Sequence, residues 1–94
     1  MKDRPYRVLE MNGACEALVF MLGHPEGFQK VDVRRHLVLS PSTSMRLHTL
    51  FVEEGVITVK PDLERHLFTL TAKGRAVAKK VTEIEKILQG KTPP

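Results

Sequence analysis

The sequence contains very little cysteine and no long apolar run. Its one cysteine, Cys15, excludes an internal disulfide and a metal site built from several cysteines. Glu16 would oppose a thiolate, so we expect Cys15 to pack on a helix, with a redox-sensing thiol or an inter-subunit disulfide as the alternative. The longest apolar run, 17–22, is shorter than the roughly 18 residues that span a membrane, and no signal-peptide charges precede it. We therefore expect a cytoplasmic protein.

Signatures of catalysis are also absent from the sequence. It has no phosphate-binding glycine loop, no HExxH zinc motif and no nucleophile elbow. The histidines fall in separate predicted elements, and only the pair of His36 and His48 could meet in space. We therefore expect neither an enzyme, nor a metal site, nor a bound cofactor. The four histidines are His24, His36, His48 and His66.

The size and charge of the chain favour one small domain with a polyanionic partner. Its 94 residues are 41% hydrophobic and 28% charged, so we expect a single domain over residues 1–94. The core of so small a domain is limited, which favours sharing apolar surface with a second subunit. Residues 1–55 carry seven basic and seven acidic residues, whereas residues 56–94 carry eight and four, so the whole net charge of +4 lies in the second part. A basic part of this kind suits a polyanion.

Glycine, proline and hydroxyl residues divide the chain into short elements. Apolar residues at helical spacing predict four helices, and two runs rich in β-branched and aromatic residues predict two strands joined by a charged loop. Residues 6–11 could form either a short strand or the start of a helix. The predicted fold is therefore mainly α with a small β-hairpin, an α+β arrangement. The helices cover 14–22, 29–38, 41–54 and 72–89, and the strands cover 56–59 and 67–70.

The segment 40–55 combines a polar beginning with an apolar end. Ser40 suits the N-cap, Pro41 suits the first turn and Gly55 suits a left-handed exit. Short hydroxyl side chains at the start of such a helix can reach base edges and phosphates, and the helix N-terminus itself attracts phosphate. Capping and solvent exposure are the alternative for these hydroxyls. The candidate DNA-binding residues of this helix are Ser42, Thr43, Ser44, Arg46 and Thr49.

Two helices joined by a tight turn and followed by a hairpin form a known DNA-reading arrangement. The stretch "STSMRLHTLFVEEGVITVKPDLERHLFTLTAKGRAVAKKV" resembles the winged helix-turn-helix core of MarR-, PadR- and HxlR-type transcriptional regulators. The shared features are "R-L-x-x-L-x-x-x-x-G-V-I" from Arg46, the Asp62 and Arg65 pair, and "L-T-x-K-G-R" from Leu70. The resemblance implies a recognition helix at 41–54 that reads the major groove.

The resemblance also implies a wing, the loop 60–66, that lies against the minor groove. Its DNA-binding candidates are Lys60, Arg65 and His66. Asp62 and Glu64 offset this positive charge, which departs from the basic wing of such regulators. Asp62 and Arg65 could equally pair with each other and close the hairpin.

The last helix carries an apolar stripe with spacings of four, three and four residues, as in a coiled-coil seam. The stripe could pack on the first helix of the same chain or pair with its twin in a dimer. We expect the dimer, because the helix is about 27 Å long and such regulators usually dimerise through terminal helices. The candidate dimerisation residues are Val77, Val81, Ile84 and Leu88.

Together these features predict a sequence-specific double-stranded DNA-binding transcriptional regulator. We expect a homodimeric repressor that reads a palindrome with half-sites about 34 Å apart. A small-molecule effector would have to bind in the dimer crevice beside the first and last helices, and nothing in the sequence identifies one. The alternatives are a winged-helix module that binds protein, and a nonspecific DNA-packaging protein, which the modest charge disfavours.

Overall fold

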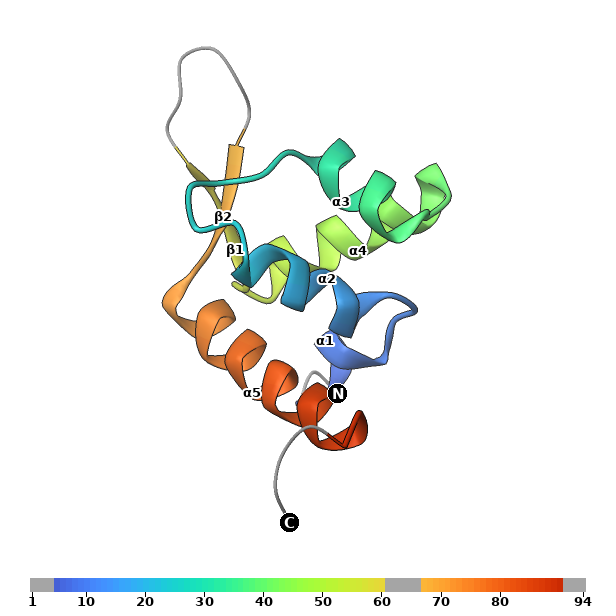
Figure 1. Cartoon of the computed structure of the whole chain (residues 1–94). Helices are drawn as coiled ribbons and strands as arrows, with labels where there is room; N and C mark the ends of the chain where they lie inside the picture. The colour runs from blue at the N-terminus through green and yellow to red at the C-terminus, as the bar shows by residue number, and fades with distance from the viewer. Residues whose placement is uncertain (1–4, 61–66, 91–94) are drawn as a thin grey trace.

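The computed structural model describes residues 5–60 and 67–90 (Figure 1). The predicted wing residues Arg65 and His66 lie outside the described residues, as do Asp62 and Glu64. The described elements follow the predicted order of helices, hairpin and long last helix. They are α1 (Arg7–Glu10), α2 (Ala14–Leu22), α3 (Lys30–Leu37), α4 (Pro41–Glu53), β1 (Ile57–Lys60), β2 (Leu67–Leu70) and α5 (Ala72–Leu88).

The hairpin is a two-stranded antiparallel sheet that gains one further pairing from an earlier segment. Ile57 lies opposite Leu70 and Lys60 lies opposite Leu67. Phe28, which precedes α3, exchanges two backbone hydrogen bonds with Phe68, of 2.9 and 2.8 Å. The Phe28 side chain is buried, so this bridge fixes the start of α3 against the hairpin.

Helix α2 lies at the centre of the molecule, between α3 on one side and α5 on the other (Figure 1). Small residues allow α2 and α5 to approach closely: Ala14 and Ala17 on α2 and Ala78 on α5 are fully buried. Larger apolar side chains from α4 and the hairpin fill the rest of the core. Among the buried residues are Leu18, Met21, Phe28, Val33, Leu47, Phe51, Val56, Ile57, Phe68, Leu70 and Val81.

Gly74 sets how closely α5 packs on the start of the hairpin. A Cβ at this position would lie 2.0 Å from the carbonyl oxygen of Val56. The same carbonyl accepts a 2.9 Å hydrogen bond from the backbone N–H of Thr71. Thr71 also caps α5, because its Oγ1 accepts a 3.0 Å hydrogen bond from the N–H of Gly74. Only glycine fits this contact, since any side chain would have to occupy the space of the Val56 carbonyl.

The helix ends agree closely with those predicted. Ser40 caps α4 by accepting a 3.2 Å hydrogen bond from the N–H of Thr43, and Gly55 leaves the helix with a φ of 72°. Helix α3 ends at Val38, whose φ is 54° although its side chain is β-branched. This left-handed conformation is rare for such a residue, so the turn between α3 and α4 is strained.

Candidate nucleic-acid interface

Helix α4 presents one buried and one exposed face. Leu47 and Phe51 are buried against the core. The residues of the opposite face are exposed along the whole helix. They recur at spacings of three and four, so they form one stripe on the helix surface. We call this stripe the outer face of α4; its members are Ser42, Met45, Arg46, Thr49, Val52 and Glu53.

The structure separates the hydroxyl residues that the sequence grouped together. Ser42 and Thr49 are exposed on the outer face, beside Arg46. Thr43 is half-buried, and its Oγ1 accepts a 2.9 Å hydrogen bond from the hydroxyl of Ser40. Ser44 is half-buried and points toward α3, where it lines two small clefts. Thr43 and Ser44 are therefore placed to cap and position α4, and Ser42, Arg46 and Thr49 are placed to contact a ligand.

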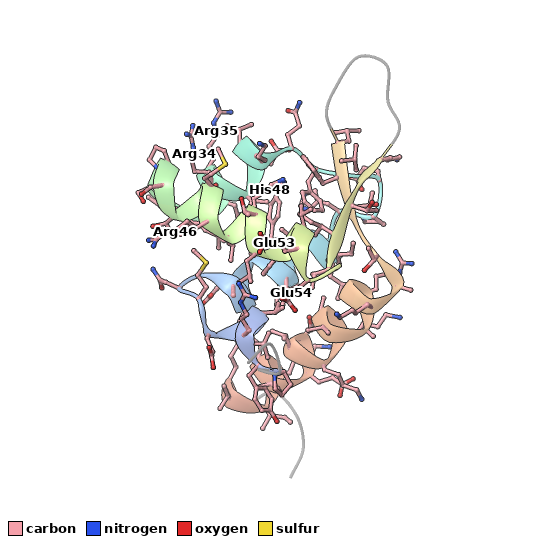
Figure 2. All side chains as sticks on the ribbon, turned by 180° about the vertical axis from the view of Figure 1, so that it is seen from behind. Arg34, Arg35, Arg46, His48, Glu53 and Glu54 are labelled. Carbon is pink, nitrogen blue, oxygen red and sulfur yellow. The ribbon has the colours of Figure 1, made fainter. Side chains whose placement is uncertain are left out.

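Three cations on α3 extend the positive surface beyond Arg46. Figure 2 shows Arg34, Arg35 and Arg46 projecting at the end of the α3–α4 pair where α4 begins. Lys30 and Arg34 line a cleft of about 210 Å³ between α3 and α4, together with Ser44 and Met45. Within the described part of the chain, none of these cations forms an ion pair. These α3 cations were not among the DNA-binding residues predicted from the sequence, because they come close to Arg46 only when α3 is folded against α4.

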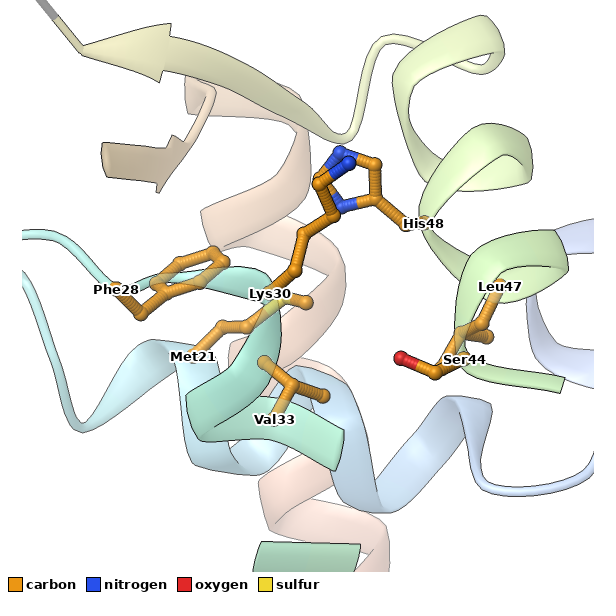
Figure 3. A pocket seen from close by; sticks show the side chains of 7 residues that line it. All are labelled: Met21, Phe28, Lys30, Val33, Ser44, Leu47 and His48. Atoms are coloured by element: carbon orange, nitrogen blue, oxygen red, sulfur yellow. The ribbon is translucent and has the colours of Figure 1, made fainter. Parts of the chain in front are cut away.

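His48 connects α4 to both α3 and the hairpin. Its ring lies 4.3 Å from that of Phe68, edge to face, and the side chain of Lys30 reaches it from α3 (Figure 3). Burial lowers the pKa of His48 below its usual value of 6.5, and the charge of Lys30 lowers this pKa further. The neutral imidazole is therefore favoured here, which suits a packing residue.

The C-terminal end of α4 is held by residues from α1 and α5. Arg7 of α1 donates a 3.2 Å hydrogen bond to the carboxylate of Glu54 and lies 3.9 Å from that of Glu53. Lys73 of α5 donates a 2.7 Å hydrogen bond to the carbonyl oxygen of Glu54. Acidic charge thus gathers at this end of α4, far from Arg46 (Figure 2), and leaves the N-terminal end positive.

The start of the wing is fixed on the body of the protein. The ammonium group of Lys60 donates a hydrogen bond to the carbonyl oxygen of Glu26, in the turn before α3. Lys60 is half-buried, so of the three wing candidates the one that the structure describes is partly engaged within the chain. Arg65 and His66 stay predictions.

The predicted dimerisation stripe divides into an inner and an outer part. Val81 is buried and Val77 half-buried against the body of the same chain. Ile84 and Leu88 are exposed, as is Ile87. Val77 and Val81 thus pack on the same chain. The end of α5, with Ile84, Ile87 and Leu88, is an apolar surface that is exposed in the single chain.

A cleft of about 270 Å³ separates the end of α5 from α1 and α2. Its walls are mainly apolar, and Glu16 and Glu85 add two carboxylates that have no cationic partner among the described residues. Cys15 also lines it; burial raises the pKa of this thiol, and Glu16 raises it further. Cys15 is therefore a packing residue with little thiolate. The apolar part of the lining is Leu9, Val19, Val81, Ile84 and Leu88.

Two further observations concern residues 5–60 and 67–90 alone. In these ranges, His, Cys, Asp and Glu side chains nowhere gather in a group of three that could bind a metal ion. No helix in these ranges is both long and apolar enough to cross a membrane.

No family model matches the sequence, and no curated protein sequence is significantly similar to it. Similar solved structures do exist. The chain is 20% identical to MepR from S. aureus in its complex with ethidium bromide, with a TM-score of 0.68 over 87% of this chain and 64% of that one. The S. aureus MepR–DNA complex is 17% identical, with a TM-score of 0.66 over 87% of this chain and 65% of that one. This chain thus spans less than two thirds of those MepR chains.

Two regulators from other organisms are equally similar. A predicted DNA-binding transcriptional regulator from E. coli is 18% identical, with a TM-score of 0.69 over 85% of this chain and 84% of that one. NMB1585, a MarR family regulator from Neisseria meningitidis, is 19% identical, with a TM-score of 0.67 over 82% of this chain and 56% of that one. The chain therefore has the winged helix-turn-helix fold of MarR-type regulators, as its sequence predicted.

Proposed function

We propose that this protein is a sequence-specific double-stranded DNA-binding transcriptional regulator, with α4 as its recognition helix. The observation that carries the proposal is the outer face of α4, where Ser42, Arg46 and Thr49 are exposed. Unpaired cations of α3 flank this face and suit phosphate contacts on either side of a groove. The fold is similar to that of S. aureus MepR, a protein that was solved as a complex with DNA, and this similarity supports the same proposal.

The residues of this surface differ in the parts of DNA that we expect them to contact. Arg46 can donate two hydrogen bonds to a guanine edge, whereas Ser42 and Thr49 can donate to bases or phosphates. Lys30, Arg34 and Arg35 lie on α3, outside the helix proposed to enter the groove, so we expect them to contact phosphates and to contribute to affinity and its salt dependence.

The test is a selection from random duplex DNA, followed by fluorescence anisotropy on the enriched sequence over a salt series. Arg46→Ala should weaken binding to that sequence by about 1–3 kcal/mol and relax the preference at one base pair. Lys79→Ala is the matched control, because it removes one positive charge from an exposed position of α5. An Arg46→Ala loss that is equal on every sequence would make Arg46 a phosphate contact. No enriched sequence, with weak and uniform binding, would overturn the proposal in favour of a protein-binding module or a DNA-packaging protein.

We further propose that the regulator is a homodimeric repressor that binds a palindromic site. The exposed apolar end of α5, with Ile84 and Leu88, supports a twofold contact there. Leu88→Glu should then produce a monomer in sedimentation velocity, since it places a charge in that contact. Val59→Glu, an equal change at an exposed apolar residue of β1, should leave self-association unchanged. A wild-type protein that is monomeric at micromolar concentration would refute the dimer.

The cleft between α1, α2 and α5 is our candidate for an effector site. Apolar walls with the unpaired carboxylates of Glu16 and Glu85 suit a hydrophobic cation, and MepR, which shares the fold, was solved with ethidium bromide. Tetraphenylphosphonium should bind in calorimetry, whereas tetraphenylborate, of the same shape and opposite charge, should not. Glu16→Gln with Glu85→Gln should abolish the difference between the two probes; equal binding of both probes to the wild type would contradict the assignment.

A further inference from the structure

The outer face of α4 carries two apolar side chains where a solvent-exposed helix would ordinarily carry polar ones. Met45 is 55% exposed and Val52 is 46% exposed. They lie seven residues apart, which is two helical turns, and Thr49 lies between them on the same stripe. Single exposed apolar residues are common on protein surfaces, but these two share the face on which Arg46 is exposed.

The solvent face of α5 before its apolar end has a different composition. The exposed positions of α5 before its apolar end are mostly charged: Lys73, Arg75, Lys79, Lys80 and Glu83. On the outer face of α4, Arg46 and Glu53 are the only charged residues. Valine also has a weaker helix propensity than the charged residues that it replaces. Met45 borders the cleft between α3 and α4 but is 55% exposed, and Val52 is 46% exposed, so packing within the described chain leaves about half of each apolar side chain in contact with solvent.

A helix in the major groove meets one apolar group there, the C5 methyl of thymine. Cytosine lacks this methyl, and the minor groove does not display it, so an apolar side chain that contacts it distinguishes thymine from the other bases. Met45 is long and unbranched and can adapt to the methyl's position, whereas Val52 presents two fixed methyl groups. The Thr49 side chain carries both a methyl and a hydroxyl and fits between them.

We propose that Met45 and Val52 are specificity-determining residues that read thymine methyl groups on both sides of the base contacted by Arg46. The proposal rests on the function proposed above and specifies bases that the DNA site contains. Seven residues of helix rise about 10.5 Å, and base pairs are spaced about 3.4 Å, so the two thymines lie about three base-pair steps apart. Each half-site then contains a guanine for Arg46 within a thymine-containing segment.

The test replaces each thymine of the enriched site, one at a time, with deoxyuridine, which lacks only the 5-methyl group. Anisotropy should show a loss of about fourfold at each contacted thymine, as expected for one buried methyl. Met45→Ala should remove the loss at one position and Val52→Ala at the other, so each variant and its deoxyuridine site form a double-mutant cycle. Val52→Thr keeps the shape of the side chain but replaces one of its two methyl groups with a hydroxyl, so it should reduce the deoxyuridine effect less than Val52→Ala does.

Val59→Ala is the control, because Val59 is a valine on β1, outside α4, and is 58% exposed against 46% for Val52. Its deoxyuridine profile should match that of the wild type. A site that is enriched and bound tightly, but whose affinity changes less than twofold with deoxyuridine at every thymine, overturns this inference and leaves the DNA-binding proposal standing. Losses that are identical in the wild type, Met45→Ala and Val52→Ala also overturn it. Failure to enrich any sequence overturns both proposals together.

Discussion

Replacing Gly74 with alanine should destabilise the fold although it improves helix propensity. The added Cβ would lie 2.0 Å from the Val56 carbonyl oxygen, whereas real Cβ contacts are essentially never shorter than 3.0 Å. Helix α5 would therefore have to move by about 1 Å, because the interior is close-packed and the neighbouring group is backbone. Overpacking of this kind costs about 1–3 kcal/mol, and disturbing the hydrogen bond from Thr71 to the same carbonyl costs about 1 kcal/mol. The higher helix propensity of alanine stabilises the fold by about 1 kcal/mol. The free energy of unfolding is therefore expected to fall by about 2 kcal/mol.

Urea denaturation followed by circular dichroism, at one protein concentration, measures this loss directly. A decrease of about 2 kcal/mol corresponds to a fall in Tm of roughly 8–16 °C for a domain of this size. Gly23→Ala is the matched control, since Gly23 ends α2 with a φ of −78° and its Cβ would meet nothing closer than 3.5 Å. That variant should be unchanged or stabilised by about 0.5 kcal/mol. A Gly74→Ala protein as stable as the wild type would refute the argument, because helix propensity alone predicts an increase.

Three further predictions concern residues around α3 and α4. Val38→Gly should raise the free energy of unfolding by about 0.5–1 kcal/mol, because it relieves a left-handed φ and the 88% exposed side chain loses no packing; a decrease in urea denaturation would contradict the strain. The lowered pKa of His48 means that the unfolded chain binds this proton more readily, so stability should fall as pH drops below 6.5 toward the folded-state pKa. His48→Gln should flatten that part of the pH profile, and Lys30→Gln should flatten it partly; an unchanged profile would contradict the assignment. Arg7→Ala should cost about 0.5 kcal/mol at low salt and nothing in 1 M NaCl, since its contact with Glu54 is a surface pair; an equal cost at both salt concentrations would indicate packing instead.

The elements that the sequence predicted well are those with signals inside a few neighbouring residues. Ser40 with Pro41 marked the start of α4, and Thr71 marked the start of α5, because caps act within one helical turn. The strand at 67–70 and the helix at 14–22 were confirmed at both ends. The first strand runs over Ile57–Lys60, one residue later than predicted, because the backbone of Val56 instead bonds to Phe51 and Thr71.

Features that depend on distant residues were not predictable in this way. The bridge between Phe28 and Phe68 joins segments forty residues apart, and no local pattern around either residue indicates it. The division of the α5 stripe followed from the burial of Ala78, which allows α2 to approach and cover Val81. The separation of Thr43 and Ser44 from the outer face of α4 depends on where α3 lies against that helix, which spacing along one helix does not reveal.

The two contacts on Glu54 fix the C-terminal end of α4 to other helices. Arg7 and Lys73 hold its C-terminal end from two helices that border the apolar cleft, whereas its N-terminal part packs on α3 and carries Ser42 and Arg46 on its exposed face. Thirteen residues of helix extend about 20 Å, so a tilt of about 3° at the held end moves the other end by about 1 Å. A displacement of that size is comparable to the tolerance of a hydrogen bond. A rearrangement of α1 and α5 that tilts α4 by this angle would therefore move Ser42 and Arg46 far enough to make or lose a contact with a ligand.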